Sequence, residues 1–316
     1  MLKTNQLHIG YGHYTVQSDL NLQANGRDLI CLTGTNGAGK STLLRTLAGL
    51  QKPLKGTITI QNKSVHKLSS YERSTLFSLV LTDPVDVENL TVHDLVALGR
   101  FPYTNWAGSL SEIDEAKITE SLQQVNLAHK AHSYLNEISD GEKQRAVIAK
   151  ALAQDTPLVL LDEPTAHLDL PNRIEIMLLL RRLSVNTQKT FILSTHELDL
   201  ALQMADKIWL MGENGVEIGI PEDLMLSGKF QKAFGSQSFK FDEADGHCKI
   251  NHLIGPLQVN IVGDKPAILW LERALIRCGI QISESAAITI EAYKGLFRVQ
   301  GIETDSIEET LRILMN

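Results

Sequence analysis

Residues 29–47 read LICLTGTNGAGKSTLLRTL: an apolar run, a glycine-rich stretch and a helix-forming segment, in that order. The apolar run 29–33 has the length of a buried strand, and Ser41 to Leu50 has helical spacing and is closed near Gly49. The glycines between them predict a tight loop, because glycine adopts backbone conformations that side chains disfavour. The stretch therefore predicts a strand, a loop and a helix, the repeating unit of an α/β fold.

The loop matches the pattern GxxxxGK[ST] over residues 34–42. Between a strand and a helix, backbone N–H groups of such a loop turn toward one anion, and the helix N-terminus adds positive potential. A glycine-rich turn that precedes a helix by chance is the alternative, and the strand–loop–helix context disfavours it. We expect Lys40 to reach the β- and γ-phosphates of a nucleotide and Ser41 to bind Mg²⁺. The residues assigned to the bound nucleotide here are Gly34, Asn36, Gly37, Ala38, Gly39, Lys40, Ser41 and Thr42.

A second apolar run, 158–161, ends in the adjacent acids Asp162 and Glu163. A short unbroken run of this kind predicts a parallel strand buried on both faces. Two carboxylates at its end are costly to bury without a cation or a catalytic task. We expect Asp162 to hold Mg²⁺ and Glu163 to act as the general base on an attacking water. The alternative is an acidic pair that caps the following turn.

The order of predicted elements indicates two domains. Predicted strands and helices alternate up to about residue 234, which favours a largely parallel core sheet. The predicted domains are residues 1–234, with a helical subdomain at about 90–155, and an accessory α/β domain at 235–316. In the first domain, helices are predicted at 91–98, 111–125, 139–153, 172–184 and 197–205, with strands at 56–60 and 191–193. In the second domain we expect a hairpin around Phe239 and Phe241, strands at 257–261, 287–293 and 296–300, a helix at 266–278, and a last helix capped by Ser306 and Glu309.

Composition excludes several classes of protein. The net charge of −7 argues against a general nucleic-acid-binding surface. Cys31, Cys248 and Cys278 are scattered and form no CxxC pair, so a disulfide scaffold or zinc site is not expected. The first ten residues lack a signal-peptide pattern, and the chain has no uncharged apolar run long enough to cross a bilayer. We therefore expect a soluble chain that reaches a membrane only through a partner.

Four further motifs resemble those of the ABC ATPases. Ile138–Arg145 reads ISDGEKQR and resembles the LSGGQ-type signature. Ala166–Asp169 resembles the D-loop, and Ser194–His196 resembles the motif with the switch histidine. Tyr11 matches the aromatic residue that stacks on adenine. The resemblance covers about residues 1–230, with all motifs in order.

The resemblance implies a P-loop NTPase fold of the ABC type that binds ATP and Mg²⁺ and hydrolyses ATP as a homodimer. In the family, the signature helix meets the γ-phosphate held by a second subunit, so Ser139, Gly141 and Glu142 are assigned to the nucleotide. Tyr11 would stack on the base with about 1–3 kcal/mol, and His196 would hydrogen-bond the γ-phosphate. Their alternatives are a core-edge tyrosine and a packing or capping histidine. The residues assigned to catalysis are Lys40, Glu163 and His196.

Two positions depart from the family pattern. Asp140 stands where the signature has its first glycine, and its carboxylate would slow closure around ATP. The family's Q-loop glutamine should lie about eight residues before Leu90, where Thr82 and Asp83 stand. Their short side chains cannot copy the reach of a glutamine. Thr82 is therefore assigned to the metal site, and the link from permease to metal is expected to run through Asp83 or a water.

Three stretches narrow the resemblance to the ATPases of iron-siderophore, haem and cobalamin importers: Asn89–Val92, Ala97–Tyr103 and His167–Asp169. This implies transmembrane permease subunits, a separate substrate-binding protein, and a cytoplasmic position on the inner face of the bacterial cell membrane. Three aromatic residues either line the groove for the permease's coupling helix or fill the core of the helical subdomain: Phe101, Tyr103 and Trp106.

Other functions stay open at this point. A soluble ABC ATPase acting on ribosomes or DNA usually has two cassettes or a coiled-coil insertion, and this chain has one cassette and no heptad stretch. A weakly catalytic, nucleotide-gated interaction module is motivated by Asp140 and Thr82. A GTPase is disfavoured because no NKxD-type guanine motif follows the loop. Residues 235–316 are either a regulatory or dimer-supporting domain or an inert addition.

Overall fold

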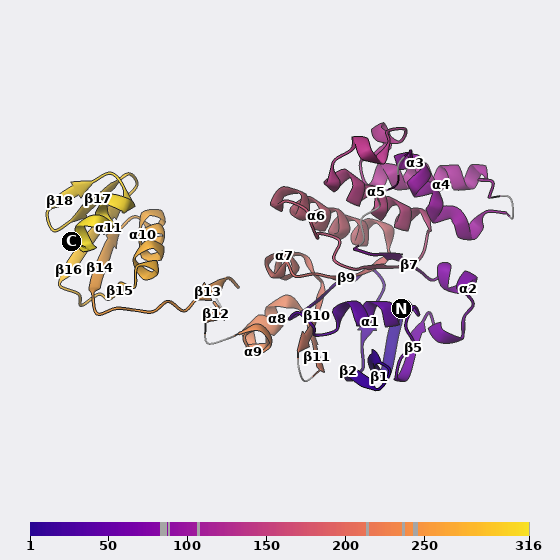
Figure 1. The fold of residues 1–316 in the computed structure, drawn as a ribbon, viewed down its shortest axis with the longest axis horizontal. Coiled ribbons are helices and arrows are strands. Elements are labelled where there is room, and N and C mark those ends of the chain that lie inside the picture. Colours follow the sequence, from indigo (N-terminus) through magenta and orange to yellow (C-terminus); the bar gives the residue numbers. More distant parts are fainter. Residues whose placement is uncertain are drawn as a thin grey trace. The chain divides into compact units, whose positions relative to one another are not determined.

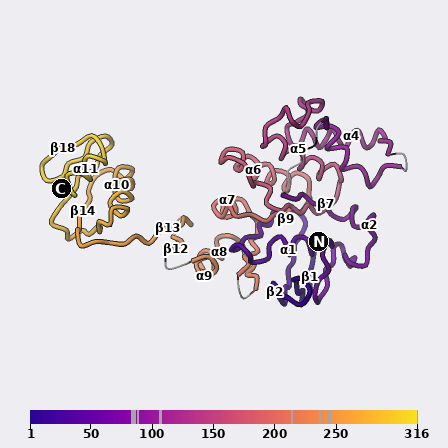
Figure 2. Tube along the Cα trace, in the orientation of Figure 1, coloured from indigo at the N-terminus to yellow at the C-terminus, as the bar shows by residue number. Residues whose placement is uncertain are grey.

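The computed structural model describes residues 1–82, 87, 89–105, 108–212, 215–235, 238–242 and 246–315. The chain divides into two compact units, which Figure 1 shows as a ribbon and Figure 2 as a trace. The first comprises Met1–Gly235 with Phe241–His247, and the second comprises Ser236–Lys240 with Cys248–Asn316. Asp83 and Trp106, which the sequence interpretation singles out, lie outside the described residues.

The first unit is built on a six-stranded sheet in the order β11-β10-β4-β9-β8-β7. Its strands are β4 (Leu29–Gly34), β7 (Phe77–Val80), β8 (Leu158–Leu161), β9 (Thr190–Ser194), β10 (Lys207–Gly212) and β11 (Gly215–Gly219). Neighbouring strands from β10 to β7 are parallel, and β11 is antiparallel to β10. Every residue of β4 and β8 is buried, as expected for parallel strands covered on both faces. The α/β fold with a largely parallel core sheet is confirmed.

A second, antiparallel sheet holds the N-terminus and has the order β2-β1-β5-β6, with β3 paired to β1. Its strands are β1 (Leu2–Tyr11), β2 (Tyr14–Leu20), β3 (Gln23–Ala24), β5 (Lys55–Ile60) and β6 (Lys63–Ser64). Helix α1 (Lys40–Leu47) shares one hydrophobic cluster with both sheets, including Leu7, Leu43 and Leu160. The helix thus begins directly after the glycine-rich loop, and it ends before the expected Leu50.

The other face of the core sheet is covered mainly by helices. Their cluster joins Cys31 and Phe191 of the sheet to Val96, Ile148 and Leu180 of the helices. The α-helices after α1 in the first unit are α2 (Ser70–Ser74), α3 (Val92–Ala97), α4 (Glu112–Gln124), α5 (Asp140–Ala153), α6 (Leu170–Thr187), α7 (Leu198–Met204), α8 (Pro221–Leu226) and α9 (Lys229–Phe234). The 3₁₀ helices are η1 (Val65–Lys67), η2 (Leu98–Tyr103), η3 (Ala128–Lys130) and η4 (Leu135–Glu137). None of the described helices is both long and apolar enough to span a membrane.

Side-chain caps fix the starts of α4 and α5. The N–H of Asp114 donates to the Ser111 hydroxyl, and the N–H of Glu142 donates to the Ser139 hydroxyl, and both helices thus begin with a capping box. Arg100 of η2 donates to Asp114 at 2.8 Å and to a main-chain oxygen at the end of α5 at 2.7 Å. This buried network ties η2 to α4 and α5.

The second unit is a small α/β structure with the sheet order β15-β14-β16-β17-β18. Its elements are β14 (Gln258–Gly263), α10 (Lys265–Arg277), β15 (Gln281–Ile282), β16 (Ile288–Tyr293), β17 (Leu296–Val299), β18 (Ile302–Thr304) and α11 (Ile307–Met315). The N–H of Glu309 donates to the Ser306 hydroxyl at 3.3 Å, which confirms Ser306 as a cap of the last helix. The expected hairpin is present as β12 (Phe239–Phe241) paired with β13 (Cys248–Ile250), while 243–245 lie outside the described residues.

Candidate nucleotide-binding site

The loop between β4 and α1 needs glycine for reasons of both backbone and space. Gly34 and Gly39 have φ of +154° and +102°, which L side chains rarely adopt. A Cβ on Gly34 would lie 2.5 Å from the backbone oxygen of Met211, and one on Gly39 would lie 2.5 Å from a methyl of Val16. Glycine at these two positions therefore lets the loop pack closely against Met211 of β10 and Val16 of β2, just before the N-terminus of α1.

Lys40 is the first residue of α1, and its ammonium lies inside the loop. Its Nζ donates to the carbonyl oxygens of Gly34 at 2.9 Å and Thr35 at 3.2 Å, and the residue is 6% exposed. Burial lowers the pKa of Lys40, and the nearby Glu163 and Asp162 oppose that shift. A phosphate entering the loop would replace neutral carbonyls with a charged acceptor, which forms the stronger hydrogen bond.

The carboxylate of Asp162 receives hydrogen bonds from two elements, and its main-chain oxygen receives one from Thr82. Ser41 of α1 donates to its Oδ1 at 3.1 Å, and Ser194 at the end of β9 donates to the same oxygen at 2.7 Å. The Thr82 hydroxyl donates to the Asp162 main-chain oxygen at 2.9 Å. Hydroxyl and carboxylate oxygens are the donors that Mg²⁺ prefers, so the residues present fit this ion. Of the assigned metal residues, Ser41 thus meets the Asp162 carboxylate, whereas Thr82 meets only the Asp162 main-chain oxygen.

Ser194 is a site residue that the sequence assignment missed. Besides donating to Asp162, its hydroxyl accepts the N–H of Glu163 at 2.8 Å. It therefore fixes both acids of the predicted pair at the carboxyl end of β8. The available signal was its place at the end of the neighbouring apolar strand, two residues before His196.

Glu163 and His196 are in direct contact. His196 Nε2 lies 2.9 Å from Glu163 Oε1, and both side chains are partly exposed. Glu163 has a φ of +48°, which is uncommon for a residue with a side chain and costs conformational energy. Strained positions of this kind are concentrated at functional sites. The two side chains assigned to water activation and phosphate sensing thus form one unit beside Lys40.

Tyr11 lies at the rim of a cavity of about 630 Å³. Its hydroxyl is 3.0 Å from the Thr42 hydroxyl, and the residue is 55% exposed. Tyr11 therefore lies at the surface, a position that suits both a core-edge tyrosine and a residue that stacks on a base. The cavity is also lined by the apolar Leu50 and Pro53 and by the charged Arg45, so an aromatic ligand next to the loop would find the Tyr11 ring with both apolar and basic neighbours.

The signature residues form the first turn of α5. Asp140 is right-handed helical, so it does not need the left-handed backbone that glycine favours, and its side chain is 77% exposed. Gly141 is constrained by space, because a Cβ there would lie 2.3 Å from Asn172 Oδ1 of α6. Glu142 accepts from the N–H of Ser139 at 2.9 Å and from its hydroxyl at 3.0 Å.

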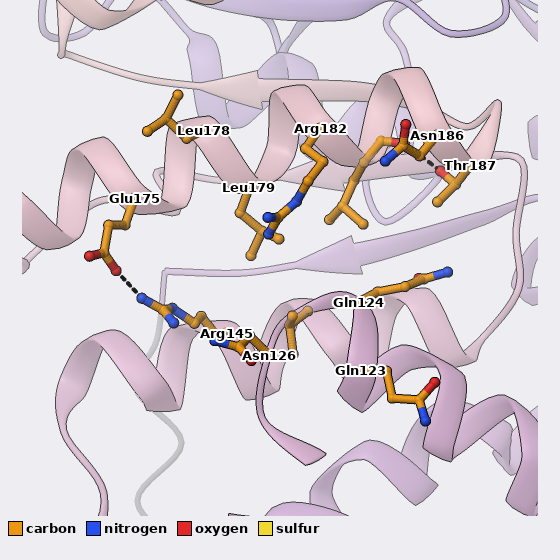
Figure 3. Close-up of a pocket in the computed structure, with 12 residues that line it drawn as sticks. Gln123, Gln124, Asn126, Arg145, Glu175, Leu178, Leu179, Arg182, Asn186 and Thr187 are labelled. Carbon is orange, nitrogen blue, oxygen red and sulfur yellow. Dashed lines mark hydrogen bonds and ion pairs between the residues drawn. The ribbon is translucent and has the colours of Figure 1, made fainter. Parts of the chain in front are cut away.

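A second cavity of about 620 Å³ separates α6 from α5 and the end of α4 (Figure 3). Arg145 of α5 and Glu175 of α6 form an ion pair beside it. This pair connects the signature helix to the helix that Asp169 of the D-loop caps. The first turns of α5 and α6 thus pack closely where Gly141 meets Asn172, and their next turns are joined by the ion pair of Arg145 with Glu175.

The predicted aromatic surface is partly described. Phe101 is 75% exposed, so it does not fill the core of the helical part of the unit. Tyr103 is 38% exposed, its hydroxyl donates to the Gln154 main-chain oxygen at 3.0 Å, and the Arg100 guanidinium stacks on its ring at 4.0 Å. Of the two aromatics that the structure describes here, Phe101 is the more exposed and so the better placed to meet a partner.

Comparison with known proteins gives two family matches. A family model described as "ABC transporter" matches residues 17–166, and one described as "Iron ABC transporter C-terminal domain" matches residues 256–315. An uncharacterized ABC transporter ATP-binding protein of Methanocaldococcus jannaschii is 38% identical over 80% of this chain and 87% of its own length. The achromobactin transport ATP-binding protein of Dickeya dadantii is 40% identical over 65% of this chain and 76% of its own length. The petrobactin import ATP-binding protein FpuD of Bacillus anthracis is 36% identical over 71% of this chain and 82% of its own length.

Solved structures agree with this fold. The post-hydrolysis dimer of an ATP-binding cassette bound to ADP and phosphate superposes with a TM-score of 0.60 and 27% identity, over 70% of this chain and 99% of that chain. CbiO1 of Clostridium perfringens, part of the ABC transporter complex CbiONQ, gives a TM-score of 0.62 and 27% identity, over 73% and 92%.

Proposed function

Because this chain belongs to the ATP-binding proteins of ABC transporters and has an iron ABC transporter C-terminal domain, we propose that its ATP hydrolysis drives an importer of a metal chelate. The chain is an ATPase of the ABC type. Relatives named for siderophore transport, achromobactin transport and cobalamin import support an iron-siderophore or cobalamin as the cargo, whereas haem rests on the motif resemblance alone. The match of residues 256–315 to an iron-transporter domain favours the iron chelates among these.

One observation supports ATP hydrolysis most strongly: the start of α1 and the carboxyl ends of β8 and β9 converge on Asp162. Its Oδ1 lies 3.1 Å from Ser41 and 2.7 Å from Ser194, beside the Glu163–His196 contact. A phosphate loop, a metal-binding acid and a partly exposed base are thus within one cluster. This arrangement serves the attack of water on a terminal phosphate.

The residues act on the triphosphate in distinct ways. Lys40 and the N–H groups of the loop bind the β- and γ-phosphates and stabilise the charge that develops on them. Glu163 accepts the proton of the attacking water, and His196 holds both the Glu163 carboxylate and the γ-phosphate oxygen. Ser41, Asp162 and Thr82 would hold Mg²⁺, which when bound neutralises phosphate charge. Tyr11 stacks on the adenine.

Two copies of the chain complete the site. The loop before α1 and the signature helix α5 belong to clusters on opposite faces of the core sheet. Ser139 of one chain is therefore proposed to meet the γ-phosphate on the loop of a second chain, head to tail. The known dimer of a cassette of 27% identity supports this arrangement.

The proposed partners are transmembrane permease subunits and, through them, a substrate-binding protein. The chain would then lie in the cytoplasm on the inner face of the bacterial membrane. The exposed Phe101 supports a docking surface for the permease near η2. Closure of the ATP-bound dimer would pull on this surface, and hydrolysis would release it.

A rate measurement on the purified chain tests the catalytic part of this proposal. Glu163→Gln should lower the turnover of ATP by roughly 10²–10⁴-fold, because it removes the general base. Glu120→Gln, an exposed acid on α4, is the matched control and should leave turnover unchanged. Wild-type turnover in Glu163→Gln would refute the assigned role.

A further inference from the structure

We propose that Lys130 is a positioning residue that neutralises Glu142, so that Ser139 can approach the γ-phosphate held by the partner subunit. This inference rests on the head-to-tail dimer of the proposed function. Lys130 is the last residue of the short helix η3 and belongs to none of the motifs named from the sequence. Its Nζ lies 2.7 Å from Glu142 Oε1.

The Glu142 carboxylate lies directly against Ser139, the residue proposed to contact the γ-phosphate. Its Oε2 accepts from the N–H and the hydroxyl of Ser139, at 2.9 and 3.0 Å. The hydrogen bond from Lys130, followed by the main-chain hydrogen bond from Ser139, lowers the pKa of Glu142 to about 2. At neutral pH the Glu142 carboxylate is therefore charged.

A γ-phosphate that accepts the Ser139 hydroxyl would be a second anion near this carboxylate. One hydrogen-bond length separates it from Ser139, and a further 3.0 Å separates Ser139 from Glu142. Two like charges would thus be roughly 6 Å apart or closer, well inside the screening length of ordinary buffers. A cation on the far oxygen of Glu142 turns that carboxylate into half of an ion pair and removes most of the repulsion.

The other acid of the signature differs in this respect. Asp140 pairs with Lys143 at 3.3 Å on the same helix, and the two side chains are 77% and 37% exposed. Water and salt screen a pair of this kind. Lys130 and Glu142 are only 33% and 23% exposed, and Lys130 comes from a different segment of the chain. Lys143 is therefore a matched control for the loss of one lysine near the signature.

The test compares four variants of the full chain: Lys130→Met, Glu142→Gln, their double variant, and Lys143→Met. Lys130→Met should raise the KM for ATP about fivefold at low salt, with kcat within about twofold, and added salt should reduce the effect. Glu142→Gln removes the charge that Lys130 neutralises, while its amide oxygen can still accept from Ser139, so its KM is the reference value for the double variant. The double variant should return to the KM of Glu142→Gln. Lys143→Met should change KM less than twofold, because an exposed ion pair contributes little free energy.

Rescue separates charge neutralisation from a merely structural role. If the double variant keeps the high KM of Lys130→Met, Lys130 only supports the loop and the proposal is wrong. The proposal is also wrong if Lys130→Met raises KM by the same factor in the Glu142→Gln background as in the wild type. If Lys130→Met does not fold, Lys130→Arg must keep the wild-type KM, and Glu142→Gln must weaken the salt dependence of KM. Failure of these tests leaves the ATPase itself intact, whereas an inactive wild-type chain would refute the proposed function first.

Discussion

The buried pair Arg100–Asp114 should make the stability of the first unit depend on pH in acid. Asp114 is 4% exposed, and its pKa is lowered from 3.8 to about 2. The hydroxyl of Ser111 is the largest cause, followed by the Ser111 main chain and Arg100. A carboxyl with a lower pKa in the folded than in the unfolded state stabilises the fold above its unfolded pKa, and this contribution is lost as pH falls toward the folded value.

The shift corresponds to about 2 kcal/mol of unfolding free energy at neutral pH. With these two pKa values, about 1 kcal/mol of it is lost between pH 5 and pH 3. Asp114→Asn removes the titrating group, so its free-energy deficit relative to the wild type should shrink by that amount over this range. Urea unfolding followed by circular dichroism measures both chains at each pH.

Glu303→Gln is the control, because this acid is exposed and lies in the second unit. It should leave the unfolding of the first unit unchanged at every pH. A deficit of Asp114→Asn that stays constant from pH 5 to pH 3 would show that Asp114 is not held ionised by its partners, and the reasoning would fail.

Three further substitutions test other contacts. Ser194→Ala removes the hydroxyl between Asp162 and the main chain of Glu163, so ATP turnover should fall about tenfold and more Mg²⁺ should be needed for half-maximal rate. A Mg²⁺ titration of the ATPase rate measures both, and a titration curve equal to that of the wild type would contradict this. Gly141→Ala places a Cβ 2.3 Å from Asn172, so the free energy of unfolding should fall by about 1–3 kcal/mol and the melting temperature by several degrees. Adding Asn172→Ala should restore the melting temperature, because it removes the clashing side chain. Phe101→Ala should keep the melting temperature of the chain but weaken its co-purification with the permease; loss of folding would instead indicate a packing role.

The site was predictable where the chemistry is local in sequence. The loop 34–42 and the capping boxes at Ser111 and Ser139 depend on neighbours within a few residues, so their patterns specify them. Ser194 was not assigned because its role requires the ends of β8 and β9 to lie side by side. Lys130 was missed for the same reason, since nothing in the local sequence places it against the signature.

The fold shows the same limit. The interpretation named no strand or helix between 207 and 234, where β10, β11, α8 and α9 form. β10 pairs with β4 from the beginning of the chain, and its register is set by that long-range contact rather than by a strong local pattern. The neighbouring helices α8 and α9 have six residues each, too short for helical periodicity to stand out.

A crystal structure of Glu163→Gln with bound MgATP would test the central claim most directly. We predict a dimer in which the triphosphate lies in the loop 34–42 and Ser139 of the second copy contacts the γ-phosphate. A nucleotide bound elsewhere, or a γ-phosphate that meets no residue of a second chain, would contradict the account.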